Sequence, residues 1–401
     1  MKILSARWTG FRNLADQEVV FSPGVNLLLG QNGQGKTNVL EALNFLALGR
    51  SHRGARTEEM IRFGSDTLHV TLEVADEREA AHRFEFGLDR SGSRRFRLDG
   101  EVIGRRSELV GRLATVFFWP ESVELVRGGP ELRRRFADQG LAGLDGDYLR
   151  SLAAYQRALR QKSHLLRDLR RGRRSLASAE QELVAWNRDL ARHAVPLGCG
   201  RADWAATLAP WAAAGYDDLS GQAAALAFEY RPRLKPLTGL PGAASAADRS
   251  VRPAADHPPA ASDADKVHFQ AEILAEFDYI GPEEARRGRP LTGLQFDDFD
   301  VRLGDRDLRV YGSQGETRTA AIALILAQSD VVYQRRRVRP VLFLDDIFSE
   351  LDRERARRLQ ERCARDHQIF IASARADDVA GWSPQDRRQW RVEDGRLTEL
   401  P

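Results

Sequence analysis

Two short motifs near opposite ends of this 401-residue chain constrain its fold more than any other feature. The first is the glycine-rich segment Gly30–Thr37, and the second is the acidic pair Asp345–Asp346. Each follows an apolar stretch with the length and composition of a buried β-strand. Lys36 and Asp345 are 309 residues apart, so a fold that unites the two motifs must be interrupted by a long insertion.

The segment Gly30–Thr37 matches the G-x-x-x-x-G-K-[ST] pattern of a P-loop. It lies between an expected strand, Val25–Leu29, and a helix pattern over Thr37–Leu48. Glycines let backbone N–H groups surround phosphate oxygens at the positive end of a helix. We expect Lys36 to contact the β- and γ-phosphates of ATP and the Thr37 hydroxyl to bind Mg²⁺. The predicted nucleotide-binding residues of this loop are Gly30, Gln31, Asn32, Gly33, Gln34, Gly35, Lys36 and Thr37.

The acidic pair follows Val341–Leu344, four apolar residues typical of a central strand. Open α/β sheets bind ligands at the carboxyl ends of such strands. We therefore predict that Asp345 helps to hold Mg²⁺ and that Asp346 polarises the attacking water. Lys36, Asp345 and Asp346 are the candidate catalytic residues. The alternative is a solvated pair that caps the following segment.

A third motif, Ser313-Gln314-Gly315-Glu316, opens a helix pattern that extends to about Tyr333. Ser313 and Glu316 have the S-x-x-E spacing of a capping box. A capped helix N-terminus also attracts anions, so Ser313 and Gly315 are candidate contacts to a γ-phosphate across a dimer interface. Ser373, which follows the strand pattern Gln368–Ala372, is a candidate γ-phosphate sensor.

A nucleotide-binding head split by a long helical insertion is typical of ABC/SMC-type ATPases. The predicted fold class is α/β, an ABC/SMC-type P-loop ATPase head with a mixed sheet, interrupted by a mainly helical arm. We assign residues 1–128 and 291–401 to the head and residues 129–290 to the arm. Leucine spacing predicts a helical hairpin over 149–195, followed by helix to about Ala227. Residues 239–265 lack apolar clusters, which predicts a flexible linker or insertion.

The sequence resembles the RecF family of bacterial recombination-repair ATPases, over most of the chain except residues 196–290. The stretches that carry the resemblance are Phe11–Leu14, the P-loop with Leu40–Ala42, Gly49–Ser51 with Arg53, Trp119–Glu121, Glu124–Pro130 with Arg133–Phe136, Tyr155–Leu159 with Gln161, Ser313–Gly315 with Arg318–Thr319, and Leu344–Asp346 with Ser349–Asp352. Three departures stand out, one of which is the stretch 239–265, which looks like an insertion. Of the family's G-P-H-R-D-D motif, this sequence keeps only Gly293 and the Asp297–Asp298 pair. After Ser313-Gln314-Gly315, Glu316-Thr317 replaces the two glutamines that are usual in the family.

The resemblance implies an ATP-dependent DNA-binding protein that supports replication, repair, recombination and the SOS response. It implies ATP-dependent homodimers that bind duplex, gapped or single-stranded DNA near single-strand gaps and help to load recombinase with RecR and RecO. Hydrolysis would be weak, DNA-stimulated and used as a switch, without nuclease or helicase activity. Basic clusters can contact a phosphate backbone, although a solvated helix face is the alternative. The candidate DNA contacts are Arg133, Arg134, Arg135, Arg170 and Arg171.

Composition excludes several classes of protein. No apolar run approaches the roughly 20 residues that cross a bilayer, and Met1–Gly10 lacks the apolar core of a signal peptide. Cys199 and Cys363 show no metal-ligand or C-x-x-C spacing. We expect a cytoplasmic protein without a membrane partner. Three rival hypotheses remain. The first is an ATP-binding subunit of a transporter, and the second is a clamp that binds ATP without hydrolysing it. The third is an ATPase coupled to a nuclease, whose candidate acidic cluster is Asp297, Asp298 and Asp300.

Overall fold

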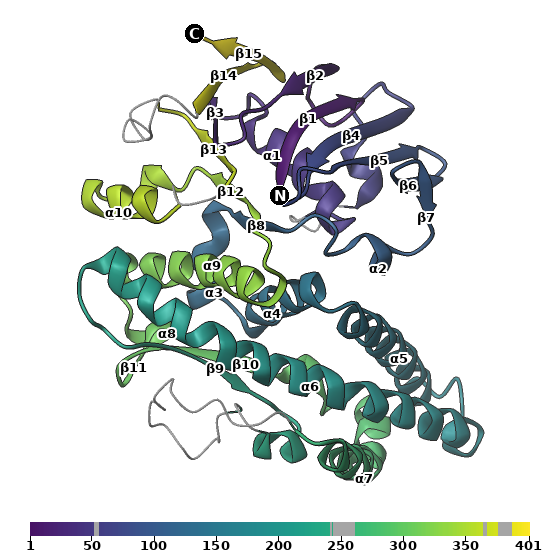
Figure 1. The fold of residues 1–401 in the computed structure, drawn as a ribbon. Helices are drawn as coiled ribbons and strands as arrows, with labels where there is room; N and C mark the ends of the chain where they lie inside the picture. Colours follow the sequence, from purple (N-terminus) through teal and green to yellow (C-terminus); the bar gives the residue numbers. More distant parts are fainter. Residues whose placement is uncertain (52–55, 241–242, 244–260, 364–366, 376–386) are drawn as a thin grey trace. The chain divides into compact units, whose positions relative to one another are not determined.

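The computed structural model describes residues 1–51, 56–240, 243, 261–363, 367–375 and 387–401 (Figure 1). The chain divides into two compact units. The first comprises Met1–Ser122, Asp218–Gly221 and Ile325–Pro401, and the second comprises Val123–Asp217 and Gln222–Leu324. The head and arm boundaries at residues 128 and 291 remain a prediction. The division into compact units differs from them, since it groups residues 291–324 with the second unit. Arg53 and most of the expected linker, 239–265, lie outside the described residues.

One sheet of the first unit is antiparallel, with the strand order β2-β1-β4-β5-β6-β7. Alternate side chains of β4 are buried, because one face of the sheet covers the core. The strands of this sheet are β1 (Lys2–Thr9), β2 (Gln17–Val20), β4 (Thr67–Ala75), β5 (Ala81–Asp89), β6 (Arg94–Leu98) and β7 (Glu101–Ile103).

The other sheet of this unit is mixed, with the order β15-β14-β3-β13-β12-β8. All neighbouring strands are parallel except β15, which is antiparallel to β14. Residues of β12 and β13 are buried throughout, as expected for parallel strands covered on both faces. The strands are β3 (Val25–Leu29), β8 (Thr115–Phe118), β12 (Val341–Asp345), β13 (Ile369–Ser373), β14 (Arg387–Glu393) and β15 (Arg396–Leu400).

Helix α1 (Lys36–Leu48) contacts strands of both sheets and is buried over almost its whole length. Its apolar residues between Val39 and Ala47 join side chains of both sheets in one hydrophobic core. The predicted helix Thr37–Leu48 is therefore confirmed, and its position fixes the P-loop, which directly precedes it. The other helical elements of this unit are η1 (Thr57–Met60), α2 (Arg106–Leu109), η5 (Phe348–Glu350) and α10 (Arg353–Cys363).

The second unit is mainly helical and carries a three-stranded antiparallel sheet, β11-β10-β9. Helix α9 (Gln314–Arg336) crosses the unit boundary at Leu324, and the 3-10 turn η2 (Pro120–Val123) crosses it at Ser122. The elements of this unit are α3 (Glu124–Arg127), α4 (Pro130–Leu144), α5 (Gly146–Arg170), α6 (Leu176–Ser220), β9 (Leu226–Arg231), η3 (Lys235–Gly239), α7 (Asp263–Arg287), η4 (Leu294–Phe296), β10 (Asp298–Leu303), β11 (Arg306–Asp307) and α8 (Leu308–Tyr311). The last three residues of α6, from Asp218, also belong to the first unit.

The helical unit differs from the sequence expectation in its second half. Two consecutive helices, α5 and α6, contain residues 149–170 and 176–195 with a turn between them, but α6 continues to Ser220 through Pro196 and Pro210. The expected helix to Ala227 is wrong from Gly221 onward, because the aromatic-rich residues of β9 form a strand. The C-terminal end of the expected linker is helical, because Ser262 and Asp265 form a capping box that starts α7.

Candidate functional site

The P-loop connects β3 to α1 in a conformation that its glycines permit. Gly33 and Gly35 have φ angles of 85° and 110°, a region that other residues adopt only with strain. A Cβ atom on Gly30 would lie 2.3 Å from the backbone oxygen of Val392 in β14. The glycine positions of the motif are therefore required by both backbone conformation and space.

The Lys36 ammonium group is held by the loop itself. Its Nζ donates to the backbone oxygens of Gly30 at 2.7 Å and Gln31 at 3.0 Å. Burial lowers the pKa of Lys36, while the nearby Asp346 and Asp345 carboxylates partly oppose that shift. A buried ammonium group with two carbonyl partners is pre-positioned to exchange them for phosphate oxygens.

Thr37 and Asp345 meet although they lie 308 residues apart in sequence. Thr37 Oγ1 donates to Asp345 Oδ1 at 3.1 Å, and Asp345 is 4% exposed. A hydroxyl and a carboxylate are oxygen ligands that suit Mg²⁺, which usually takes its other ligands from water and substrate phosphates. The described part of the chain contains no group of three or more His, Cys, Asp or Glu residues that could hold a metal. This donor set fits an ion that bridges protein and nucleotide.

The other predicted residues of the sheet edge lie beside this pair. The carboxyl ends of β3, β12 and β13 are level, with Leu29 opposite Ser373 and Asp345 opposite Ala372. Asp346 has a φ of 49° and donates its N–H to the Ala372 oxygen at 2.9 Å. Ser373 is buried, and its backbone oxygen accepts from the Gly30 N–H at 3.4 Å. The structure thus gathers the P-loop, both aspartates and Ser373 at one edge, while their roles remain predictions.

Two further segments contact the P-loop that motif reasoning did not assign to it. Asn13 Nδ2 donates to the Gly33 oxygen at 3.2 Å and its Oδ1 accepts from Asn38 at 2.7 Å. Gln34 accepts two hydrogen bonds from the β14–β15 turn. Its side-chain Oε1 accepts from the Asp394 N–H, and its backbone oxygen accepts from the Gly395 N–H. Asn13 belongs to a stretch that carried the family resemblance, which was the only signal for it.

The Ser313 motif lies in the second unit and forms the predicted capping box. Glu316 N–H donates to Ser313 Oγ at 3.2 Å, and Ser313 N–H donates to Glu316 Oε2 at 2.8 Å. The Glu316 carboxylate is therefore turned back onto the first turn of α9. Whether Ser313 and Gly315 contact a phosphate remains a prediction.

The candidate DNA contacts separate into a buried and an exposed group. Arg133 is 2% exposed, pairs with Asp298 at 2.7 and 3.1 Å and donates to backbone oxygens at the end of α3. Its donors are therefore already used inside the unit in this conformation, and its assignment to DNA remains a prediction that the structure does not support. Arg134 is partly buried and donates to the Asp297 oxygen at 2.6 Å. The exposed members are Arg135, Arg170 and Arg171.

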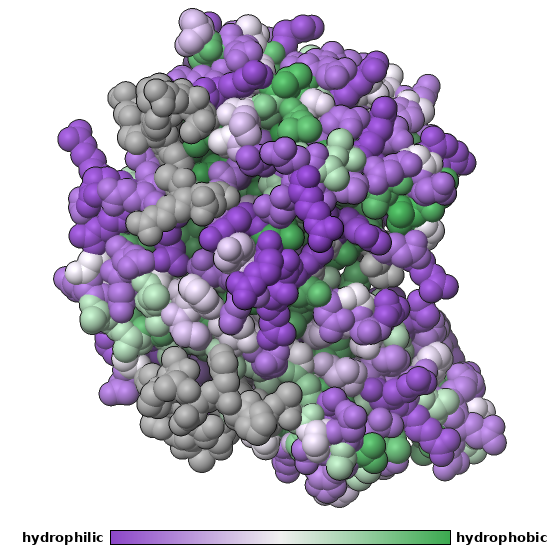
Figure 2. Space-filling view, in the orientation of Figure 1, coloured by the Kyte–Doolittle hydropathy of each residue, from purple (hydrophilic) through white to green (hydrophobic). Residues whose placement is uncertain are grey.

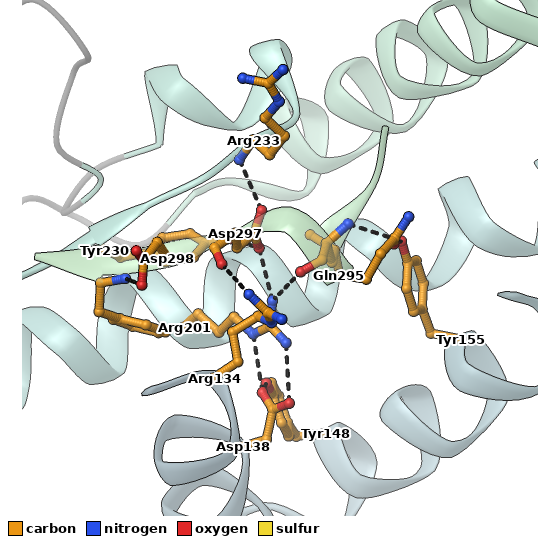
Figure 3. A network of polar contacts seen from close by, with 12 residues as sticks. Arg134, Asp138, Tyr148, Tyr155, Arg201, Tyr230, Arg233, Gln295, Asp297 and Asp298 are labelled. Carbon is orange, nitrogen blue, oxygen red and sulfur yellow. Dashed lines mark hydrogen bonds and ion pairs between the residues drawn. The ribbon is translucent and has the colours of Figure 1, made fainter. Parts of the chain in front are cut away.

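Asp297, one member of the acidic cluster considered for a nuclease, is buried in the core of the second unit, whereas Asp298 and Asp300 are partly exposed (Figure 3 shows Asp297 and Asp298). Asp297 accepts from Arg201 at 2.8 Å, from the Tyr230 hydroxyl at 2.5 Å and from the Arg233 N–H at 2.8 Å. Arg201 also forms a two-bond pair with Asp138, at 3.0 and 3.1 Å. Because arginine donors occupy Asp297 and Asp298, these carboxylates connect α4, α6 and β9 rather than offering a metal site.

We expect Asp297→Ala to destabilise the protein by about 3–5 kcal/mol, because it removes one of the two carboxylates that pair with the buried Arg201 and leaves the Tyr230 hydroxyl and the Arg233 N–H without their acceptor. Asp300→Ala is the matched control, since Asp300 pairs with Arg231 at 2.7 Å but is partly exposed. The control should cost under about 1 kcal/mol. Urea denaturation followed by circular dichroism measures both. Equal losses of unfolding free energy in the two variants would show that the buried Asp297 pair contributes no more to stability than the partly exposed Asp300 pair.

No helix in the described residues is long and apolar enough to span a membrane. On the face shown in Figure 2, hydrophilic side chains predominate and hydrophobic ones form small separate patches. This surface offers no broad apolar belt on the visible side.

Comparisons with known proteins agree on one relationship. The sequence model of the RecF/RecN/SMC N-terminal domain family matches residues 3–386. The DNA replication and repair protein RecF of Lactobacillus delbrueckii subsp. bulgaricus is 32% identical, over 98% of this chain and 95% of its own length. The protein of the same description from Roseiflexus castenholzii is 33% identical, over 96% of this chain and 97% of its own.

Solved structures give the same picture of the fold. One is described as the recombination mediator protein RecF-ATPrS in the RecFOR pathway. It has a TM-score of 0.84 and 25% identity, and the match covers 100% of this chain and 98% of that chain. An Smc head bound to the C-winged helix domain of ScpA has a TM-score of 0.55 at 14% identity, which bears on the fold alone. The predicted fold class, an ABC/SMC-type P-loop ATPase head with a helical insertion, is confirmed.

Proposed function

This chain belongs to the RecF family within the RecF/RecN/SMC N-terminal domain proteins, and on that premise we propose that it is an ATP-dependent DNA-binding protein of replication, repair and recombination. The observation that carries the proposal is the contact between Thr37 and Asp345, which joins the two nucleotide motifs at one sheet edge. The similar RecF structures are described as ATP and ATPrS forms, which supports ATP as the nucleotide.

Each residue at the sheet edge has a different role in binding or hydrolysing ATP. P-loop N–H groups and Lys36 hold the phosphates, while Thr37 and Asp345 would hold Mg²⁺, which would neutralise charge on the phosphates. Asp346 orients and polarises the attacking water, and Ser373 contacts the γ-phosphate. Hydrolysis is weak, stimulated by DNA and used as a switch.

ATP holds two copies of the chain together by contacting both of them. Ser313 and Gly315 at the start of α9 in one copy contact the γ-phosphate in the P-loop of the other. ATP then favours the closed dimer, and hydrolysis removes the group that joins the halves. The dimer acts in the cytoplasm, binds DNA near single-strand gaps, and helps to load recombinase with RecR and RecO during replication repair and the SOS response.

The test is analytical ultracentrifugation of the full chain alone, with ATP and Mg²⁺, with ADP and Mg²⁺, and with ATP, Mg²⁺ and a gapped duplex. We expect a monomer without nucleotide and with ADP, a dimer with ATP, and a larger species with DNA. A single mass under all nucleotide conditions would refute the dimer switch.

The exposed arginines at the end of α5 provide a direct test of DNA contact. The double variant Arg170→Ala/Arg171→Ala should bind duplex DNA about tenfold more weakly at low salt. The slope of log affinity against log salt should become less steep by about 2, because binding then neutralises two fewer phosphates and releases fewer counterions from the DNA. Fluorescence anisotropy across a salt series measures both quantities. Arg357→Ala/Arg358→Ala in α10 is the control, since both arginines are already paired with Glu354 and lie in the other unit. Equal effects of the two double variants would argue against a specific contact.

A further inference from the structure

An ion pair joins the β10–β11 hairpin to the first turn of α9. Arg306 Nη2 donates to Glu316 Oε1 at 2.8 Å, while Glu316 Oε2 accepts from the Ser313 N–H at 2.8 Å. Both oxygens of the carboxylate are therefore held by donors within the second unit. Neither residue belongs to the nucleotide motifs of the sheet edge.

The Glu316 carboxylate has two opposing effects at this helix end. It stabilises α9, because a negative charge near a helix N-terminus interacts favourably with the helix dipole. It also lowers the positive potential on which binding of an anion at the same place depends. The pKa of Glu316 is lowered to about 2, first by the hydrogen bond from Arg306 and then by Ser313. The group is therefore charged at neutral pH, and only a neighbouring cation can offset it.

We propose that Arg306 is a positioning residue for the ATP-bound dimer, which compensates the charge of Glu316 and so keeps the Ser313 end of α9 attractive to the γ-phosphate in a second copy. The inference rests on the proposed function, because it requires that Ser313 and its helix meet a partner's nucleotide. It explains how this chain carries a carboxylate three residues after Ser313 and still offers an anion-binding helix end.

A simpler role for the pair is a mechanical tether between the hairpin and α9, and the two roles predict different results. A tether is weakened by the loss of either partner, so Arg306→Ala and Glu316→Gln would both impair the dimer. Charge compensation matters only while Glu316 is charged. Under charge compensation, Glu316→Gln should therefore rescue Arg306→Ala, because the glutamine amide oxygen can still accept from the Ser313 N–H.

The experiment measures the dimer dissociation constant by sedimentation velocity with a non-hydrolysable ATP analogue and Mg²⁺, for the wild type, Arg306→Ala, Glu316→Gln and the double variant. We expect Arg306→Ala to weaken the dimer about fivefold, the upper range for a partly exposed ion pair. Glu316→Gln and the double variant should both dimerise at least as tightly as the wild type. Arg309→Ala is the matched control, because Arg309 is an exposed neighbour in α8 that forms no ion pair with the described residues, and it should leave the dissociation constant unchanged.

Three results would overturn the inference. These are an unchanged dimer in Arg306→Ala, a double variant as weak as Arg306→Ala, or an equal loss in Arg309→Ala. A monomeric wild type would instead remove the proposed dimer itself, and titration with a fluorescent ATP analogue would show whether nucleotide binding survives in that case. Thermal unfolding of each variant separates any loss of folding from loss of the interface.

Discussion

A Lys36→Met variant should bind ATP about 100-fold more weakly than the wild type and should remain monomeric at ATP concentrations that dimerise the wild type. The physical reason is that each charge-assisted hydrogen bond from the ammonium group contributes about 1.5–3 kcal/mol. Methionine keeps the length and apolar stem of the side chain but offers no donor. Titration with a fluorescent ATP analogue measures the affinity, and light scattering measures the mass.

The same variant must still fold for this result to be informative. Lys36 Nζ donates to two backbone oxygens of the loop, so its loss leaves them without that partner, and a modest fall in melting temperature is expected. Lys266→Met is the matched control, because Lys266 is exposed and, among the described residues, forms an ion pair only with its helical neighbour Asp263, at 2.8 Å. ATP-dependent dimers in Lys36→Met would contradict the role of the P-loop in assembly.

Local patterns in the sequence were sufficient to predict the nucleotide-binding sheet edge. Val25–Leu29 is a strand with the predicted bounds, and β12 extends the predicted Val341–Leu344 by one residue. Both are continuous apolar runs next to glycine or acidic residues, which is the pattern of a buried parallel strand. The glycines of the P-loop specify its backbone conformation, so the loop geometry also followed from sequence.

Contacts between distant segments could not be predicted in this way. Asn13 and Gln34 connect the P-loop to the β1–β2 connection and to the β14–β15 turn through one or two hydrogen bonds each. Such bonds leave no periodic trace along the chain. The strand β9 was missed for a related reason, because its stability depends on pairing with β10, which lies about 70 residues later.

The burial of Arg133 had a signal in the sequence, in the spacing of its neighbours on the helix rather than in its charge. Residues three, four and seven positions apart share one face of a helix, and Arg133 shares such a face with Phe136, Ala137 and Gly140, all buried in α4. Its two arginine neighbours point elsewhere, because consecutive residues on a helix do not face the same side. A run of arginines therefore cannot be read as one basic surface before the helical face of each is assigned.

An Asp346→Asn variant should retain ATP binding and dimerisation but hydrolyse ATP at least about 100-fold more slowly, because removal of a general base typically costs 10²- to 10⁴-fold. The substitution is well matched to the site. Asp346 has a φ of 49°, a conformation that asparagine also adopts readily. Its backbone bonds to Ala372 and Ser349 do not depend on the carboxylate. The expected product is a long-lived ATP-bound dimer, measured by phosphate release and by gel filtration over hours.

Asp99→Asn is the control for this variant, because Asp99 also has a positive φ, 53°, in the β6–β7 turn of the same unit. It should leave hydrolysis and the lifetime of the dimer unchanged. The comparison also separates a switch from a clamp that binds ATP without hydrolysing it. In a clamp the wild-type dimer would persist as long as the Asp346→Asn dimer, since neither protein would remove the γ-phosphate. In a switch only the variant persists, because Asp346 then acts on the bond that holds the two copies together. Rapid phosphate release by Asp346→Asn would remove Asp346 from the chemistry and leave Asp345 as the carboxylate that acts at this edge.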